Sequence, residues 1–109
     1  MSGVETYKYE KSIVGLIYVD NYDDVKNSTP DINRPLVLAE IDKNINAYFS
    51  KYKGIVRKYE NDKYLIVTDY AAIEEIEAKK FDILDIMREL NIGNTIPITL
   101  SIGVCSIGE

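Results

Sequence analysis

Apolar residues along the chain fall into runs that predict strands. Residues 12–20 (SIVGLIYVD) form a nearly continuous apolar run that ends in a carboxylate, which is typical of a central strand covered on both faces. Residues 54–59 and 64–68 are two shorter strand-like runs, and the second can also be buried on both faces. Residues 60–63 between them (ENDK) suit a tight turn, because Asn and Asp adopt positive φ readily. Together these residues predict a β-hairpin with a charged tip.

Two other stretches carry apolar residues at three- and four-residue spacing, which predicts amphipathic helices. Pro35 opens the first helix, where its missing N–H is not needed, and Gly54 is a suitable stop. The apolar stripe of this helix is Leu38, Ile41, Ile45, Tyr48 or Phe49, and Tyr52. The second helix is predicted over residues 70–90, with Asp69 as its N-cap. Its stripe is Ile73, Ile76, Phe81, Leu84, Met87 and Leu90.

The remaining segments complete the order of elements. Residues 21–34 are rich in Asp, Asn, Ser and Pro, which predicts an irregular loop or a short helical turn. Residues 97–107 (PITLSIGVCSI) are rich in β-branched residues and predict a last strand. The simplest way to pack these elements is one antiparallel sheet with both helices on one face. This is the ferredoxin-like βαββαβ arrangement of the α+β class. We therefore predict one domain over residues 12–109, after a polar lead of residues 1–11.

Composition excludes several classes of function. The chain has 109 residues, enough for one domain with a buried core, and a formal net charge of −5. A nucleic-acid polymer is not expected as a partner, since no basic stripe is available to contact phosphates, whereas a free nucleotide needs only a few local donors. The absence of histidine excludes His-based zinc sites and Ser-His-Asp triads. The single Cys105 excludes an internal disulfide and is expected to be a buried small hydrophobe. No apolar run approaches the ~20 residues of a membrane span.

Carboxylates are the first candidate chemical groups. Asp20, Asp23 and Asp24, at the end of the first predicted strand, could hold a cation, or they could form a solvated acidic loop. Glu60 and Asp62 at the hairpin tip could join Asp20 as metal ligands. They could equally be turn residues neutralised by Lys58 and Lys63, because exposed ion pairs of this kind contribute little.

Tyrosines and cations are the second group. Tyr18 and Tyr22 flank the loop after the first predicted strand and are the best candidates for stacking a nucleotide base, although a tyrosine in a strand or helix stripe is more often a packing residue. Arg57 and Lys63 could contact phosphates, the first through a bidentate guanidinium and the second through the point charge of its ammonium.

Placed along the predicted order of strands and helices, several motifs resemble a GGDEF domain, the nucleotidyl cyclase fold of diguanylate cyclases. The segment Glu60-Asn61-Asp62-Lys63-Tyr64 stands where the signature loop of that family stands, and the hydrophobic strand LIV follows it. Residues 16–22 (LIYVDNY) stand where the first strand ends in Asp-x-Asp-x-Phe. Residues 99–104 (TLSIGV) resemble the strand T-x-S-I-G-V. The resemblance covers roughly residues 12–107.

Departures from the family pattern imply a degenerate domain. Two-metal nucleotidyl transfer needs hard carboxylate ligands, yet Tyr18 replaces the first metal-binding Asp of the family and only Asp20 of the pair is left. Glu60 and Asn61 stand where two glycines let the backbone approach the nucleotide, and Lys63 stands where a further acidic residue belongs. The resemblance therefore implies a GGDEF domain that does not make cyclic-di-GMP.

Other motifs of the family are also missing. Its guanine-reading positions correspond to Lys26 and Arg34, and its inhibitory Arg-x-x-Asp motif corresponds to residues 51–54 (KYKG). The resemblance further implies a C-terminally truncated fold, without the closing helix and strand of a complete GGDEF domain.

One group of degenerate domains is similar in several segments at once. VDNYDDV, KYLIV, KFDILDIMREL and TLSIG resemble the GdpP/YybT-type cyclic-di-AMP phosphodiesterases. Those proteins combine membrane helices, a PAS domain, a degenerate GGDEF domain and a DHH/DHHA1 phosphodiesterase domain, which is expected to bind Mn and is absent from this chain. The resemblance implies a cytoplasmic domain of a cell-membrane protein, with the PAS and DHH/DHHA1 domains of the same parent chain as partners.

Three functions follow from this resemblance. The first is a regulatory relay between the PAS and DHH/DHHA1 domains, with pairing to a second copy as a homodimer. The second is weak ATP hydrolysis on one Mg ion held by Asp20 and a neighbouring carboxylate. The third is binding of ATP or another nucleotide without turnover. No cofactor is expected in this fragment other than Mg brought in with ATP.

Overall fold

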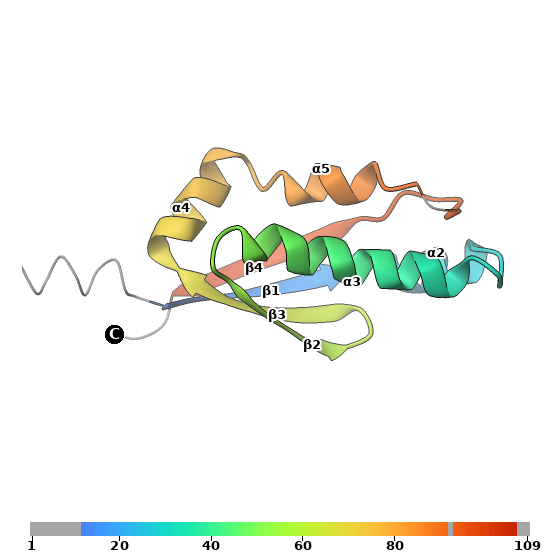
Figure 1. The fold of residues 1–109 in the computed structure, drawn as a ribbon, viewed down its shortest axis with the longest axis horizontal. Helices are drawn as coiled ribbons and strands as arrows, with labels where there is room; N and C mark the ends of the chain where they lie inside the picture. The colour runs from blue at the N-terminus through green and yellow to red at the C-terminus, as the bar shows by residue number, and fades with distance from the viewer. Residues whose placement is uncertain (1–11, 92, 107–109) are drawn as a thin grey trace, which may run out of the picture.

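The computed structural model describes residues 12–91 and 93–106, which form four strands and four helices (Figure 1). In chain order these are β1 (Ser12–Val19), α2 (Tyr22–Ser28), α3 (Arg34–Ser50), β2 (Ile55–Glu60), β3 (Lys63–Asp69), α4 (Tyr70–Ala78), α5 (Ile83–Arg88) and β4 (Leu100–Ser106). The strands form one antiparallel sheet in the order β2-β3-β1-β4. This arrangement confirms the predicted ferredoxin-like α+β fold.

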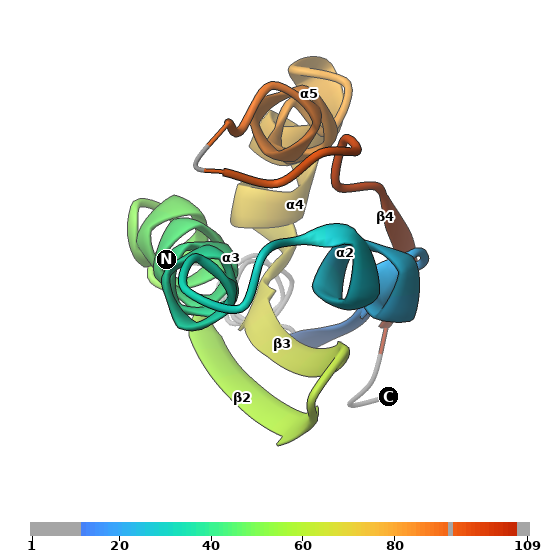
Figure 2. The ribbon, with the colours of Figure 1, turned by 90° about the vertical axis from the view of Figure 1, so that its right-hand side faces the viewer.

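β1 lies inside the sheet, between β3 and β4. Its side chains alternate, so that Ile13, Ile17 and Val19 are buried, whereas Leu16 and Tyr18 are 38% and 39% exposed. The prediction that this strand is covered on both faces is therefore wrong for the described residues. The physical reason is that α3, α4 and α5 all pack on one face of the sheet (Figure 2), so the period-two alternation of a strand decides which side chains they cover.

The predicted hairpin is confirmed as β2 and β3, joined by a two-residue turn at Asn61 and Asp62. The pairing register shifts between Lys58 and Glu60, a β-bulge that bends and twists the strand just before the tip. Burial in β3 alternates from Tyr64 onward, so only one face of this strand is fully buried, contrary to the prediction for residues 64–68.

The predicted first helix is confirmed as α3, with Pro35 in its first turn. Its buried side chains are Val37, Ile41, Ile45, Tyr48 and Phe49. At its end the left-handed conformation falls on Lys53, with a φ of 59°, rather than on the predicted stop residue Gly54. Gly54 donates its N–H to the carbonyl of Phe49 at 2.8 Å, and a Cβ on Gly54 would lie 3.1 Å from that oxygen. A side chain at position 54 is thus disfavoured by close packing rather than by φ.

The predicted second helix is wrong as a single helix, because it divides into α4 and α5. Lys80 and Phe81 between them adopt left-handed φ values of 56° and 52°. This turn points Phe81 toward the core and places Asp82 where its carboxylate accepts a hydrogen bond from the Tyr48 hydroxyl at 2.5 Å. The predicted N-cap of α4 is confirmed, since the carboxylate of Asp69 accepts the N–H of Ala72 at 2.8 Å.

Replacing Lys80 with glycine is expected to raise the free energy of unfolding by roughly 0.5–1 kcal/mol. Glycine adopts left-handed φ without the steric cost that an L side chain meets there, and this gain exceeds the extra entropy glycine loses on folding. Urea unfolding measures the change. The matched control is Lys43→Gly in the interior of α3, which should lower the free energy of unfolding. Destabilisation by Lys80→Gly would contradict the left-handed turn.

Residues 21–34 contain α2, so of the two predicted alternatives the helical one is right. β4 begins at Leu100 rather than at the predicted Pro97, which has no N–H to donate to a strand ladder. The predicted lead, residues 1–11, and the side chain of Cys105 lie outside the part of the chain that the structure describes. Among the described helices, none has the length and apolar character needed to cross a membrane.

Candidate functional site: a cleft between α2 and the hairpin tip

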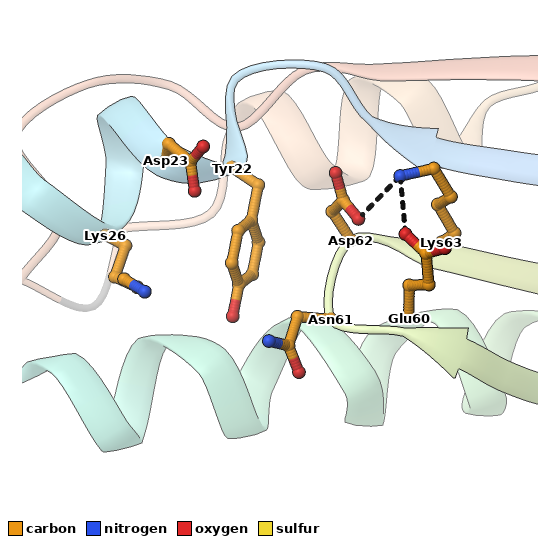
Figure 3. Close-up of a pocket in the computed structure, with 7 residues that line it drawn as sticks. All are labelled: Tyr22, Asp23, Lys26, Glu60, Asn61, Asp62 and Lys63. Atoms are coloured by element: carbon orange, nitrogen blue, oxygen red, sulfur yellow. Dashed lines mark hydrogen bonds and ion pairs between the residues drawn. The ribbon is translucent and has the colours of Figure 1, made fainter.

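A polar cleft of about 480 Å³ separates α2 from the tip of the β2–β3 hairpin (Figure 3). Its lining side chains are Tyr22, Asp23 and Lys26 of α2, and Glu60, Asn61, Asp62 and Lys63 of the tip. Two segments that are far apart in the sequence therefore form one site, and it contains the predicted candidates Tyr22, Lys63 and both tip carboxylates.

The hairpin tip is held from two sides. The N–H of Val19 donates to the carbonyl of Asp62 at 2.9 Å, which ties the turn to the end of β1. On the other side, the buried hydroxyl of Tyr64 donates to the carboxylate of Asp42 on α3, and the ammonium of Lys58 lies 3.2 Å from the same carboxylate. Asp42 thus joins β2, β3 and α3 directly beside the cleft.

Stability is expected to fall as the pH rises above about 10. Burial, and then the hydrogen bond to Asp42, raise the pKa of the Tyr64 hydroxyl above the ordinary value of 10.0. A group whose pKa is higher in the folded state stabilises the fold fully below its unfolded pKa, and it loses that contribution as the pH rises. In urea unfolding at pH 8 and pH 11, Tyr64→Phe should lose less stability over this interval than the unsubstituted chain. Equal losses would contradict this account.

α2 is positioned by two side chains that the sequence did not single out for this role. The side-chain amide of Asn21 donates to the carbonyl of Pro97 at 2.7 Å and accepts the N–H of Thr99 at 3.2 Å. Arg34 donates from Nε to the carbonyl of Lys26 at 2.9 Å and from Nη2 to that of Thr29 at 3.3 Å. These carbonyls belong to the last turn of α2 and to its C-cap Thr29, where backbone acceptors lack partners within the helix. Arg34, which the resemblance aligns with a guanine-reading position, here donates hydrogen bonds to the C-terminal end of α2.

Lys63 dominates the electrostatics of the tip. Its ammonium lies 2.9 Å from the carboxylate of Glu60 and 3.1 Å from that of Asp62, as Figure 3 shows. The hydrogen bonds to Glu60 and then Asp62 raise the pKa of the Lys63 ammonium, so it remains charged at neutral pH. A fixed positive charge thus occupies the space between the two tip carboxylates.

The α2 side of the cleft offers an aromatic ring and a cation. The pKa of the Tyr22 hydroxyl is raised by burial first and by the negative charge of Asp42 next. The ammonium of Lys26 lies 5.9 Å from the centre of the Tyr22 ring. Asp23, Glu60 and Asp62 oppose Lys26 and Lys63 in the lining, which leaves one net negative charge. A phosphate group would therefore meet no net positive field here.

Three predicted candidates lie outside this cleft lining. Tyr18 lies on the sheet face away from the helices, where its ring centre is 5.6 Å from the Lys63 ammonium. The carboxylate of Asp20 accepts a hydrogen bond from the Ser101 hydroxyl at 2.8 Å. Arg57 is exposed on β2. The structure thus brings the tip residues together with Tyr22 and leaves Tyr18, Asp20 and Arg57 on the other surface.

The predicted metal ligands are separated in the same way. Glu60 and Asp62 both face Lys63, while Asp20 is bonded to Ser101. In the part of the chain that the structure describes, no group of three or more Cys, Asp and Glu side chains is arranged to hold a metal ion. A divalent cation at the tip would have to displace the Lys63 ammonium, so the donor set as it stands does not fit Mg²⁺.

Sequence comparisons give the relatives of this chain. The family model described as "Cyclic-di-AMP phosphodiesterase GdpP-like, GGDEF domain" matches residues 17–108. The cyclic-di-AMP phosphodiesterase GdpP of Bacillus subtilis (strain 168) is 30% identical over 98 residues, which is 90% of this chain and 15% of that protein. The cyclic-di-AMP phosphodiesterase PdeA of Listeria monocytogenes serotype 1/2a (strain 10403S) is 26% identical over the same shares. The chain therefore spans about 15% of the length of these curated relatives.

Solved structures share the fold. The GGDEF domain of FimX from Pseudomonas aeruginosa superposes with a TM-score of 0.72 at 15% identity, covering 91% of this chain and 62% of that one. The dimeric guanylyl cyclase domain of the RhoGC fusion protein from Blastocladiella emersonii gives a TM-score of 0.71 at 17% identity, covering 90% and 57%. At these identities the likeness is one of architecture alone.

Proposed function

Because the chain belongs to the family of GGDEF domains of GdpP-like cyclic-di-AMP phosphodiesterases, we propose that it is a regulatory domain of a larger phosphodiesterase and does not act as a diguanylate cyclase. In this proposal the parent is anchored in the cell membrane, and the domain relays a signal from a PAS domain to a DHH/DHHA1 domain. The hydrolysis of cyclic-di-AMP would take place outside this chain.

The observation that carries the proposal is the position of Lys63. Nucleotidyl transfer by two metal ions requires carboxylates that are free to coordinate Mg²⁺ and triphosphate oxygens. Here both tip carboxylates are bonded to the Lys63 ammonium, and Glu60 and Asn61 add side chains to the turn itself. The framework of the fold is kept, while the two tip carboxylates that could bind a metal ion are paired with Lys63 instead.

The route of the chain through the sheet supports a relay. The chain enters through β1 and leaves through β4, and these strands pair with each other, with Ile13 opposite Ser106. Segments that precede and follow the domain in a longer protein would therefore begin side by side. The cleft lies near the other end of the sheet, where Val19 contacts the tip. A change at the cleft that shifts β1 against β4 would reach both flanking segments.

The test compares cyclic-di-AMP hydrolysis by the intact parent protein with that of a parent lacking residues 12–106. We expect deletion to change the rate several-fold while the DHH/DHHA1 domain still binds its metal. The isolated domain should form no cyclic-di-GMP from GTP and Mg²⁺. An unchanged rate after deletion, or cyclic-di-GMP made by the domain, would overturn the proposal.

A second candidate function is nucleotide sensing in the cleft, with or without weak ATP hydrolysis. Its support is the Tyr22 ring beside Lys26 in a cleft large enough for a base. Calorimetric titration with ATP, with and without Mg²⁺, would measure binding, and Tyr22→Ala should abolish it while Tyr70→Ala on α4 should not. Hydrolysis on an ion held by Asp20 would take place outside the cleft lining, and in that case Asp20→Ala should lose turnover. If no heat of binding and no hydrolysis are detected at millimolar ATP, both nucleotide sensing and ATP hydrolysis are excluded.

A further inference from the structure

The sheet face that the helices leave uncovered carries ordered rows of side chains. The strand registers place Arg57 opposite Leu65 and Leu65 opposite Leu16, and directly opposed residues share a face. Tyr18, opposite Lys63, lies in the next row. We call this surface the open face and define it by Leu16, Tyr18, Ile55, Arg57, Tyr59 and Leu65.

Large apolar side chains gather on the open face. Ile55 and Tyr59 are 58% and 49% exposed, and with Leu16 and Tyr18 they make up four of the eight exposed large hydrophobic side chains among the described residues. The row that contains Leu16 continues to Gly103, where an added Cβ would meet no atom within 4 Å. An exposed surface of Tyr, Ile and Leu, with open space at Gly103, has the composition of an interface core.

Two opposite charges on the same surface have no ionic partner among the residues that the structure describes. The guanidinium of Arg57 makes no hydrogen bond or ion pair to any residue that the structure describes. Asp20 follows buried Val19, and its carboxylate is bonded to the hydroxyl of Ser101, which pairs opposite Tyr18 and so faces the same way. No cation lies within ion-pair distance of Asp20 among the described residues. Within residues 12–91 and 93–106, the open face thus has one cation without an ionic partner, on β2, and one such anion, at the end of β1.

We propose that the open faces of two copies of this chain pack against each other about a two-fold axis, with Arg57 of each copy facing Asp20 of the other. A two-fold interface brings the same patch of both subunits together, so it needs a surface that is complementary to itself. An apolar centre with one unpaired charge of each sign meets that need. If the two-fold axis passes midway between Arg57 and Asp20, it places Arg57 of each copy opposite Asp20 of the other. Two equivalent ion pairs then form across the interface.

A second copy fits this surface better than an unrelated acidic or basic partner. A purely acidic partner would leave Asp20 unpaired, and a purely basic one would leave Arg57 unpaired. Each copy carries a formal net charge of −5, so two copies repel each other at long range and need contacts that offset this repulsion. Face-to-face packing of twisted sheets, with the apolar rows in the centre, supplies them. The inference locates the expected homodimer contact and does not depend on the proposed function.

Sedimentation equilibrium of the whole chain over a wide concentration range tests the proposal. We expect a reversible dimer, with a dissociation constant raised on the order of tenfold or more by Arg57→Asp and likewise by Asp20→Arg. The double variant Arg57→Asp/Asp20→Arg should return toward the original value. The two single variants change net charge in opposite directions, so a common loss of affinity cannot come from general repulsion.

Controls separate the open face from other surfaces and from unfolding. Lys43→Asp reverses a charge on the exposed side of α3 and should leave the dimer almost unchanged, whereas Ile55→Glu should abolish it. Circular dichroism checks that each variant is folded. A chain that stays monomeric at millimolar concentration overturns the proposal, as does a dimer that is indifferent to Ile55→Glu and Arg57→Asp. Cyclic-di-AMP hydrolysis is not part of this test, so its outcome is separate from that of the regulatory proposal.

Discussion

Replacing Asp42 with alanine is expected to lower the free energy of unfolding by about 1–3 kcal/mol. The substitution leaves the buried hydroxyl of Tyr64 without its acceptor and removes the carboxylate that faces the Lys58 ammonium. Because one side chain joins α3 to both strands of the hairpin, the loss should be concentrated beside the cleft. Urea unfolding at pH 7 measures the total, and hydrogen exchange of the hairpin amides should show faster opening.

A double-mutant cycle separates the hydrogen bond from other effects of this substitution. In a Tyr64→Phe background the hydroxyl is already gone, so Asp42→Ala should cost much less than in the unsubstituted chain. Glu74→Ala on the exposed side of α4 is the matched control and should change stability by no more than about 0.5 kcal/mol. Additive costs in the cycle would show that Asp42 and Tyr64 do not act together.

Ile45→Ala should have the largest effect on stability, a loss of about 2–5 kcal/mol. Ile45 is fully buried on α3, at the centre of the cluster between that helix and the sheet, so truncation removes apolar contacts and leaves a cavity. Thermal and urea unfolding would both report it.

The same substitution at an exposed position is the control for this core prediction. Ile32 is 88% exposed, and Ile32→Ala should change the free energy of unfolding by no more than about 0.5 kcal/mol. Similar losses at the two positions would contradict the placement of α3 on the sheet.

Local patterns were sufficient for much of the architecture. The turn residues Asn61 and Asp62 between two strand-like runs predicted the hairpin, and the spacing of Ile41, Ile45 and the following aromatic residues predicted the buried side of α3. These predictions hold because a hairpin turn and a helical stripe depend on residues close together in the sequence.

The break between α4 and α5 shows where local patterns fail. Ile76 and Met87 of the predicted stripe are both fully buried, so periodicity alone predicts one helix. The left-handed turn at Lys80 and Phe81 becomes favourable because Asp82 then meets the hydroxyl of Tyr48 on α3. That contact joins residues 34 positions apart, and no local signal reports it.

For the candidate site, the sequence alone determined which chemical groups are present: no histidine, a lysine in the signature turn and a tyrosine where a metal-binding carboxylate would stand. Only the tertiary structure decided how they are grouped. It placed Tyr22 against the tip, turned Asp20 toward Ser101, and made Asn21 and Asp42 the residues that hold the cleft. The physical reason is that strand and helix periods are set by neighbours along the chain, whereas a polar side chain takes whichever partner the packed elements bring within reach.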